Sequence, residues 1–314
     1  MRRPDRAAAR HLLPLSLLVA CGRDKISGLD VIPCADLDPD RRARKVHFQA
    51  PDPDGVPRIF RVDADGAGLC RMGPAFADAP PGAERAPAAS ADGLALAFVG
   101  EVDAGAGVVR ADAFGDDRLL LEDGPFRDPA WDAFGGNVYA VREDDAGDAL
   151  VRFAAGGGGL VELWTAPGLR LAGPAPSPDG AHLLVEGEDG VDEGIFHLST
   201  AAGAGPEPRL LRAGGGAPAW RGDGGAVVLT LDGGVAVAPW EGEGLGAPVE
   251  VPGLEGAGQL LDPCFIGEEV LLSADLLEVL DLWVVRPDGA DLRQITAGLG
   301  DKRAADCGRV ERGG

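Results

Sequence analysis

Pro174-Ala175-Pro176-Ser177-Pro178-Asp179-Gly180-Ala181-His182-Leu183-Leu184 is the stretch on which the fold depends. It contains a proline, then a turn rich in Ser, Pro, Asp and Gly, and then an apolar run. The same frame begins at four other prolines, spaced 42–45 residues apart: Pro87, Pro129, Pro218 and Pro263. A repeat of about 40 to 50 residues that holds several short strands is typical of one blade of a β-propeller.

Length and composition agree with an all-β fold. The chain has 314 residues, of which 45% are hydrophobic, and it contains 49 glycines and 25 prolines. Glycine and proline at this frequency disfavour long helices and supply many turns. With a degenerate first unit opening at Pro33-Cys34, the repeats number six. We therefore predict a six-bladed β-propeller of four-stranded antiparallel blades over residues 33–314.

Apolar alternation predicts strands inside each unit. Lys45–Gln49 alternates in the first unit, and Ala226–Leu231 and Val235–Ala238 are predicted strands of the fifth. Arg58–Met72 aligns without a gap on Asp281–Ile295, and in both segments two strands flank an Asp-Gly turn, where glycine accepts positive φ. The aspartates of the repeated turns are expected to cap backbone amides, which is a structural role.

Two segments carry a family resemblance. Ser177-Pro178-Asp179-Gly180 with its following strand, and Leu282–Gly289 with Gln294-Ile295-Thr296, resemble the two halves of the TolB-type propeller repeat. The resemblance covers about residues 33–307 and is poorest at the start, where Arg41 replaces the glycine after Asp40. It implies six blades and a periplasmic location. It does not include the N-terminal α/β domain of TolB, so the Tol-Pal partnership is not implied.

The N-terminus has the pattern of an export signal. Arginines within the first ten residues precede the short apolar run Leu12–Ala20, so residues 1–20 are predicted to be a lipoprotein signal peptide. A run of nine is far below the roughly 20 residues of a membrane-spanning helix. Leu18-Val19-Ala20-Cys21-Gly22 resembles the bacterial lipobox, which implies cleavage before Cys21 and acylation of its thiol. The alternative is an ordinary secretory signal with an incidental cysteine.

The segment after Cys21 predicts how the protein is attached to a membrane. Residues 21–32 lack periodicity and are interpreted as a lipid-anchored tether. An aspartate directly after the lipidated cysteine would resemble an inner-membrane retention signal, and this chain has Gly22 there instead. We therefore expect the protein to be anchored in the outer membrane, facing the periplasm. The formal net charge of −22 opposes binding to nucleic acid, and it favours a soluble, self-repelling monomer.

Four cysteines remain after Cys21 and are disulfide candidates: Cys34, Cys70, Cys264 and Cys307. An even number of cysteines in an exported protein predicts disulfides, and four of them allow three connectivities. We favour a bond between Cys34 and Cys307, which would link the first and last blades. Cys264 is the main alternative partner of Cys307.

No catalytic, cofactor-binding or metal-ligating set is recognisable, and no cofactor is expected. The chain contains no Gly-x-Ser-x-Gly elbow and no His-Glu-x-x-His pair. His182 and His197 are spaced to face each other across a hairpin, with Glu186, Glu188 and Asp192 nearby. Ordinary strand histidines are the favoured interpretation, and a metal site is the alternative.

Three glycine-containing segments are interpreted as turns. Asp52–Gly55 and Asp63–Gly66 lack the further ligands of a calcium loop and are predicted hairpin turns. Gly156–Gly159 is followed by no Lys-Ser or Lys-Thr and is predicted to be a turn of the third blade, with no phosphate site.

Two functional classes follow from these predictions. The favoured hypothesis is a cell-envelope lipoprotein whose propeller is a non-enzymatic scaffold that binds an envelope protein or a small ligand on one propeller face. The alternative is a propeller enzyme of the glycan hydrolase or lyase type, with carboxylates from different blades meeting in the central channel.

Overall fold

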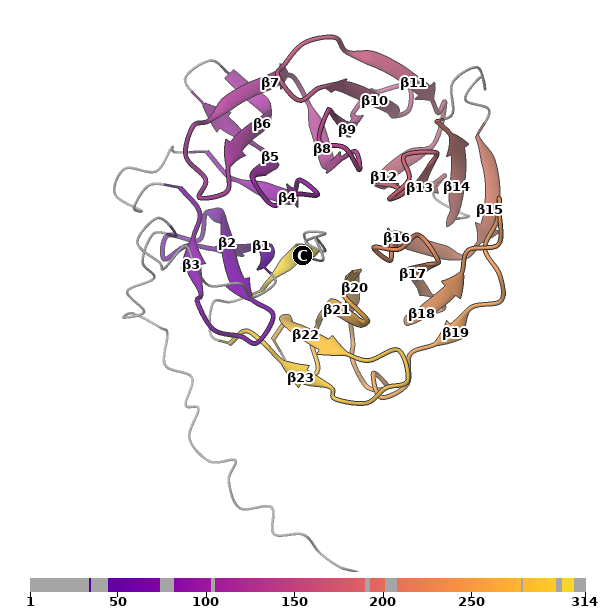
Figure 1. Ribbon diagram of the computed structural model, residues 1–314. Helices are drawn as coiled ribbons and strands as arrows, with labels where there is room; N and C mark the ends of the chain where they lie inside the picture. The colour runs from indigo at the N-terminus through magenta and orange to yellow at the C-terminus, as the bar shows by residue number, and fades with distance from the viewer. Residues whose placement is uncertain are drawn as a thin grey trace, which may run out of the picture.

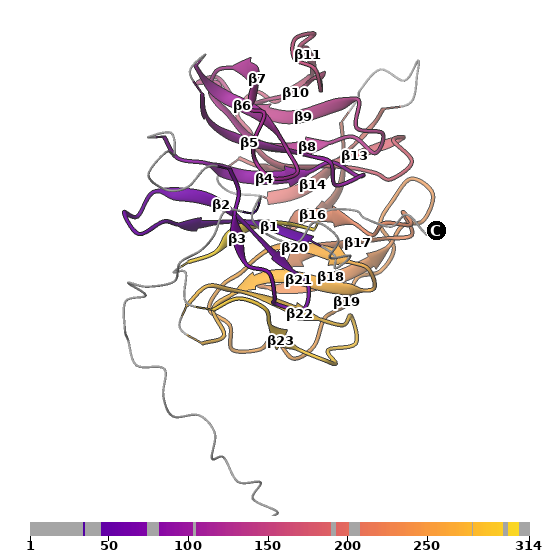
Figure 2. The same ribbon diagram turned by 60° about the vertical axis from the view of Figure 1, so that its left-hand side comes forward.

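The structure is a computed structural model, and it describes residues 34, 45–73, 82–102, 105–189, 193–200, 208–277, 279–297 and 301–307. Its strands form six four-stranded antiparallel sheets around a central axis, as Figure 1 shows. Figure 2 shows the same ring with the sheet that contains β1 brought forward. The prediction of a six-bladed propeller with four-stranded antiparallel blades is therefore confirmed.

Blade one combines strands from both ends of the described chain. From the inside outward it contains β24 (Arg303–Cys307), β1 (Lys45–Pro51), β2 (Pro57–Asp63) and β3 (Cys70–Arg71). Backbone pairing of β24 with β1 closes the ring, with Cys307 opposite Val46. The C-terminal strand therefore takes the innermost place of blade one and leaves no open edge there.

Blades two to six each use four consecutive strands. Blade two is β4 (Arg85–Ala89), β5 (Ala95–Val102), β6 (Gly105–Asp112) and β7 (Leu119–Asp123), and blade three is β8 (Phe126–Trp131), β9 (Asn137–Arg142), β10 (Ala149–Ala154) and β11 (Val161–Thr165). Blade four is β12 (Arg170–Pro176), β13 (His182–Glu188), β14 (Glu193–Ser199) and β15 (Arg209–Ala213). Blade five is β16 (Gly215–Trp220), β17 (Ala226–Leu231), β18 (Gly234–Pro239) and β19 (Val249–Glu250), and blade six is β20 (Leu260–Ile266), β21 (Glu269–Ala274), β22 (Asp281–Val285) and β23 (Arg293–Gln294).

The hydrophobic core lies between the blades. Successive side chains of a strand point to opposite faces of its sheet, so each strand contributes to two interfaces. In β21, Val270 and Leu272 pack against blade five, whereas Leu271 packs against blade one. Within the described residues, each boundary between neighbouring blades has its own apolar cluster. This packing explains the near-continuous apolar runs in the sequence.

The repeated turns have the predicted structural role. In blade four, Ser177 Oγ accepts a hydrogen bond of 2.9 Å from the amide of His182, and Asp179 Oδ1 accepts one of 2.9 Å from the amide of Ala181. Gly180 has a φ of +71°. The predicted hairpin turns are also present: Asp52 Oδ1 accepts the amide of Val56 at 2.9 Å.

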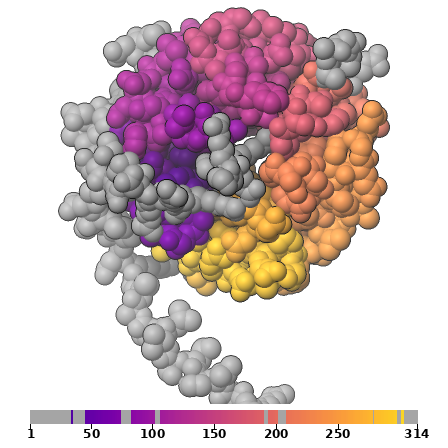
Figure 3. All heavy atoms as spheres, in the orientation of Figure 1, coloured from indigo at the N-terminus to yellow at the C-terminus, as the bar shows by residue number. Residues whose placement is uncertain are grey.

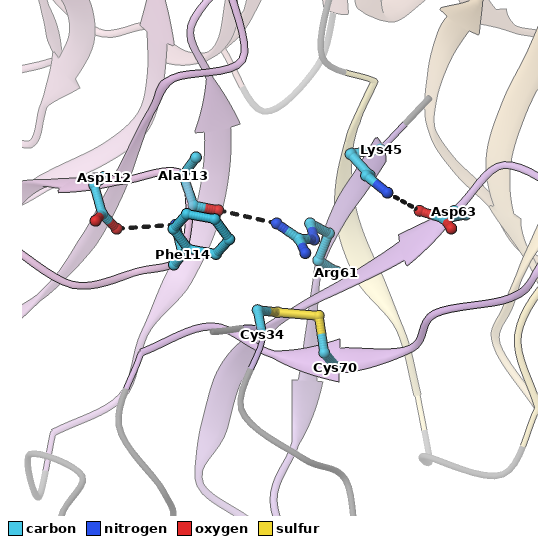
Figure 4. Close-up of a disulfide and its surroundings, with 8 residues drawn as sticks. All are labelled: Cys34, Lys45, Arg61, Asp63, Cys70, Asp112, Ala113 and Phe114. Atoms are coloured by element: carbon cyan, nitrogen blue, oxygen red, sulfur yellow. Dashed lines mark hydrogen bonds and ion pairs between the residues drawn. A yellow bond between two sulfur atoms is a disulfide. The ribbon is translucent and has the colours of Figure 1, made fainter. Parts of the chain in front are cut away.

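Cys34 forms a disulfide with Cys70, as Figure 4 shows. The favoured Cys34–Cys307 bond is therefore wrong. Cys70 lies on the outermost strand of blade one, whereas Cys307 lies on the innermost. Three strand spacings of about 4.8 Å separate those positions, more than the roughly 4.4–6.8 Å between the Cα atoms of a disulfide. Cys264 is also disulfide-bonded, and its partner lies outside the described side chains.

The predictions for the N-terminus concern residues 1–32, including Cys21, which lie outside the described residues. Within the described part, the structure contains no helix that is long and apolar enough to cross a membrane.

Candidate functional site: the central pocket

A pocket of about 700 Å³ lies on the propeller axis. Its wall is built from the innermost strands of blades two to six, and its mouth from the turns that follow these strands, including Asp92, Phe134 and Pro178. Figure 3 shows the centre of the ring open beside blades four and five. We refer to this cavity as the central pocket.

A bulge recurs in the wall of the central pocket. It lies at the residue before the proline that begins each repeat, which we call the leading proline. Each of these five innermost strands shifts its register by one residue there. Proline cannot donate to the strand ladder, and it disfavours the right-handed helical region for the residue before it. The residue before the proline has positive φ in every case: Ala86 (+48°), Asp128 (+48°), Gly173 (+54°), Ala217 (+44°) and Asp262 (+49°).

Polar side chains of one blade cap the bulge amides of the next. Asp128 Oδ2 in blade three accepts a hydrogen bond of 3.2 Å from the amide of Gly173 in blade four. Glu186 Oε2 in blade four accepts one of 2.7 Å from the amide of Ala217 in blade five. Gln49 in blade one does the same for Ala86 at 3.3 Å. The channel wall is thus joined from blade to blade by side-chain acceptors.

The lining of the central pocket is acidic. Among the described residues it contains no Lys, Arg or His. Burial raises the pKa of Asp128 above its ordinary value, and burial together with neighbouring carboxylates, Asp128 among them, raises the pKa of Glu186. The lining carboxylates are Asp92, Asp128, Asp132, Glu186, Asp223, Asp262 and Glu268.

One arginine stands next to the mouth of the central pocket. Arg221 Nε donates a hydrogen bond of 2.9 Å to Asp223 Oδ1, and this contact lowers the pKa of Asp223. Arg221 also lies 3.9 Å from Glu268. The guanidinium group of Arg221 therefore offsets the negative charge of Asp223 and Glu268 at one point of the pocket rim.

Aromatic side chains complete the wall. Trp131, Trp220 and Phe265 occupy the same register in blades three, five and six, opposite Val138, Val227 and Val270. Phe134 is 78% exposed at the mouth. Carboxylates beside aromatic faces are a combination that favours cations, because both attract positive charge.

His182 and His197 do face each other, as predicted. His182 Nδ1 lies 3.0 Å from His197 Nε2, so one ring nitrogen donates and the other accepts. Both rings also contact Trp240, and His182 stacks on Trp220 behind the pocket wall. In the described part of the chain, no group of three or more His, Cys, Asp or Glu side chains is arranged to hold a metal ion, and Asp192 lies outside that part.

None of the pocket carboxylates was predicted to line a pocket, and Glu186 was named only as a neighbour of His182 and His197. Asp128 and Asp262 directly precede leading prolines, whereas Glu186 lies on the second strand of blade four. The signal available in the sequence was the residue before the proline in each repeat, whose backbone is restricted by the proline.

Comparison with known proteins agrees with this architecture. Residues 62–181 match the family model described as the lipoprotein LpqB beta-propeller domain. TolB from Acinetobacter baumannii superposes with a TM-score of 0.70 at 14% sequence identity, over 84% of this chain and 66% of that protein. The chain therefore shares the six-bladed propeller fold of TolB. A search of curated protein sequences found no match.

Other solved structures share the TolB-like fold. Putative TolB from Agrobacterium tumefaciens has a TM-score of 0.57 at 14% identity and covers 81% of this chain and 89% of its own. A puromycin hydrolase S511A mutant has a TM-score of 0.56 at 16% identity, over 81% of this chain and 52% of that one. The chain spans just under two thirds of the A. baumannii protein and about half of the hydrolase. Identities this low show the fold alone.

Proposed function

We propose that this protein is a lipid-anchored, non-enzymatic binding module of the bacterial cell envelope, and that its central pocket receives a cationic group of a partner protein or small ligand. The observation that carries the proposal is the pocket lining, with seven carboxylates and no basic side chain among its described residues. Concave sites with few polar groups of one kind are typical ligand sites. The lipoprotein description of the matched family supports the location in the envelope.

Binding is tested with a cationic probe. We expect fluorescein-labelled hexa-arginine amide to bind the full chain saturably at pH 7 and 50 mM NaCl, as measured by fluorescence anisotropy. Salt at 300 mM should weaken binding, because the Debye length falls. The double variant Asp128→Asn/Glu186→Gln should weaken it by about fivefold or more, since it replaces two acidic groups of the pocket by neutral amides while each amide oxygen still accepts the bulge N–H.

A matched control separates the pocket from the net charge. Asp145 and Glu255 are exposed and lie outside the pocket lining, so Asp145→Asn/Glu255→Gln changes the net charge equally. This variant should bind the probe like the wild type. Equal weakening in both double variants would show attraction by overall charge alone and would overturn the proposal for the pocket.

The anchor has its own test. Several acyl chains on Cys21 would hold the protein stably on a membrane, since one chain gives only marginal binding. We expect the mature protein to partition into the detergent phase, to sediment with outer membranes, and to be released or left unprocessed by Cys21→Ser. A soluble wild-type protein with another N-terminal residue would contradict the anchor.

A second candidate is an enzyme of the glycan hydrolase or lyase type. Asp128 and Glu186 line one cavity and both have raised pKa values, which is a feature of acid–base sites. Incubation with peptidoglycan fragments and soluble oligosaccharides should then release new reducing or unsaturated ends. Loss of that release in both Asp128→Asn and Glu186→Gln would favour the enzyme, and no release by the wild type would favour the binding module.

A further inference from the structure

The mouth of the central pocket has an apolar side and a charged side. At the turns that follow the innermost strands, blades three and four contribute Ala133, Phe134 and Pro178 to the lining. The corresponding turns of blades five and six contribute the carboxylates of Asp223 and Glu268. A ligand that enters the pocket therefore passes apolar surface on one side of the mouth and charged groups on the other.

Phe134 is the largest side chain on the apolar side, and the turns around it fix its position. Asp132 Oδ1 accepts a hydrogen bond of 3.2 Å from the amide of Phe134 and one of 2.8 Å from the amide of Gly136. The Phe134 ring lies against the neighbouring turn of blade four, because a Cβ added to Gly180 would be 2.7 Å from Cε2 of the ring. The backbone and one edge of the ring are thus held, while Phe134 remains 78% exposed.

The exposure of Phe134 indicates the kind of ligand that would cover it. A single exposed apolar side chain is ordinary on a protein surface, but this one stands at the mouth of a concave, acidic site. Aromatic side chains in such positions contribute much of the binding energy at interfaces, since they bury a large area at a low cost in conformational entropy. A cationic group inside the pocket leaves most of the ring in solvent. Covering the ring takes a ligand that continues from the pocket over its rim.

We propose that the partner of the central pocket is an extended polypeptide segment in which a basic residue stands next to an aromatic residue, and that Phe134 recognises this segment by packing against the aromatic neighbour. Consecutive Cα atoms are about 3.8 Å apart, so the neighbour of an inserted basic residue stays at the mouth. The pocket carboxylates bind the charge, and Phe134 binds the ring. This inference rests on the proposed function, because it assigns the chemistry of the partner to the same pocket.

Two labelled peptides of equal length and charge test the inference. Both carry an N-terminal fluorescein and a C-terminal amide: one reads Arg-Phe-Arg-Phe-Arg, and the other reads Arg-Ser-Arg-Ser-Arg. Fluorescence anisotropy with the full chain at pH 7 and 50 mM NaCl gives both dissociation constants. We expect the phenylalanine peptide to bind about fivefold more tightly, which is the order of magnitude that one aromatic pair contributes.

Three variants locate the contact. Phe134→Ala should bind both peptides about equally, with the serine peptide bound as by the wild type, and Phe134→Tyr should keep the preference because it keeps the ring. Folding should be unaffected, since the side chain is exposed. Val249→Ala is the control: Val249 is 66% exposed on β19, the outermost strand of blade five, and should leave both affinities unchanged.

The outcomes separate this inference from the proposed function. Equal binding of the two peptides by the wild type, or equal losses in Phe134→Ala and Val249→Ala, would overturn the role of Phe134, while hexa-arginine binding would leave the proposed function standing. A preference that disappears in Phe134→Ala, together with no effect of Asp128→Asn/Glu186→Gln on either peptide, would support the aromatic contact and contradict the cation site. No binding of either peptide would overturn both.

A small competitor tests whether the ligand has to be a polypeptide segment. Phenethylammonium carries one cation and one aromatic ring but no chain that continues over the rim. We expect it to displace the labelled phenylalanine peptide only at concentrations far above those of the unlabelled peptide. Displacement at equal concentrations would assign the pocket to a small aromatic cation and would overturn the polypeptide partner.

Discussion

The indole Nε1 of Trp220 donates a hydrogen bond of 2.9 Å to the carbonyl oxygen of Ala175, across the boundary between blades five and four. Trp131 makes the equivalent bond of 3.0 Å to Ala88, across the boundary between blades three and two. In both cases the tryptophan lies two residues after a leading proline, and its acceptor lies one residue after the leading proline of the preceding blade. The Pro-x-Trp element of the repeat therefore connects neighbouring blades.

Trp220→Phe should lower the free energy of unfolding by about 1 kcal/mol, because it leaves the half-buried carbonyl of Ala175 without this donor. Phenylalanine fits this register, since Phe265 occupies it in blade six. Urea unfolding measures the effect. Trp164→Phe is the control, because the Trp164 indole makes no hydrogen bond to any other residue that the structure describes. A loss no larger than that of the control would show that the bond contributes nothing.

Most of the fold could be predicted because each blade repeats the same local signals. The strand predicted at Ala226–Leu231 has the observed bounds of β17, since both of its faces pack between blades and its run is apolar throughout. The turn at Asp179-Gly180 could also be predicted from the sequence, because the turn requires a positive φ that glycine tolerates.

The rest depends on contacts that a single sequence does not display. β24 has no apolar alternation, and it becomes a strand through its ladder with β1, a pairing of residues far apart in the chain. Asp128 and Glu186 occupy different positions of their repeats, and they share one cavity only because the blades are arranged radially. Cys34 pairs with Cys70 and not with Cys307, because Cys307 lies on the innermost strand of blade one and Cys70 on the outermost. The spacing of cysteines in the sequence does not reveal this placement.

Gly180→Ala should destabilise the protein by about 1–3 kcal/mol for two reasons, backbone strain at φ +71° and a Cβ only 2.7 Å from Cε2 of Phe134. Thermal and urea unfolding measure it. Gly135→Ala isolates the strain, because Gly135 has the same φ of +71° and an added Cβ meets nothing within 4 Å. Gly222→Ala, without positive φ or a nearby atom, should be close to neutral. An unchanged stability of Gly180→Ala would refute the role of this turn.

Stability should fall as the pH drops below 6.5. Burial, with smaller contributions from His182 and Arg209, lowers the pKa of His197 to about 4 from its ordinary 6.5. Between these values the unfolded chain binds more protons at this position than the folded one, so the free energy of unfolding decreases as the pH falls through the window. His47 acts in the same direction, since burial lowers its pKa to about 3.

The pH effect is checked by urea unfolding of the wild type and His197→Asn at pH 7.0, 6.0, 5.0 and 4.5. The variant loses the contact with His182 at every pH, so the informative quantity is the slope. We expect a shallower decline in the variant than in the wild type. Parallel curves would show that protonation of His197 is not coupled to unfolding. Asp128 and Glu186 oppose the trend in both proteins, because their raised pKa values favour the fold at low pH.

The Cys34–Cys70 bond should be found by nonreducing peptide mapping of the oxidised protein. Its closed loop spans a sequence separation of 36 residues, so its loss should cost about 4 kcal/mol in the idealised chain-entropy model, and often less in practice. Cys34→Ser, Cys70→Ser and the double variant should be destabilised similarly, because each removes the same bond. Variants are preferable to a reductant, which would also open the bond of Cys264. Recovery of Cys34 linked to Cys307 would contradict the position of Cys34 beside the outermost strand of blade one, and with it the assignment of β24 as the strand that closes the ring.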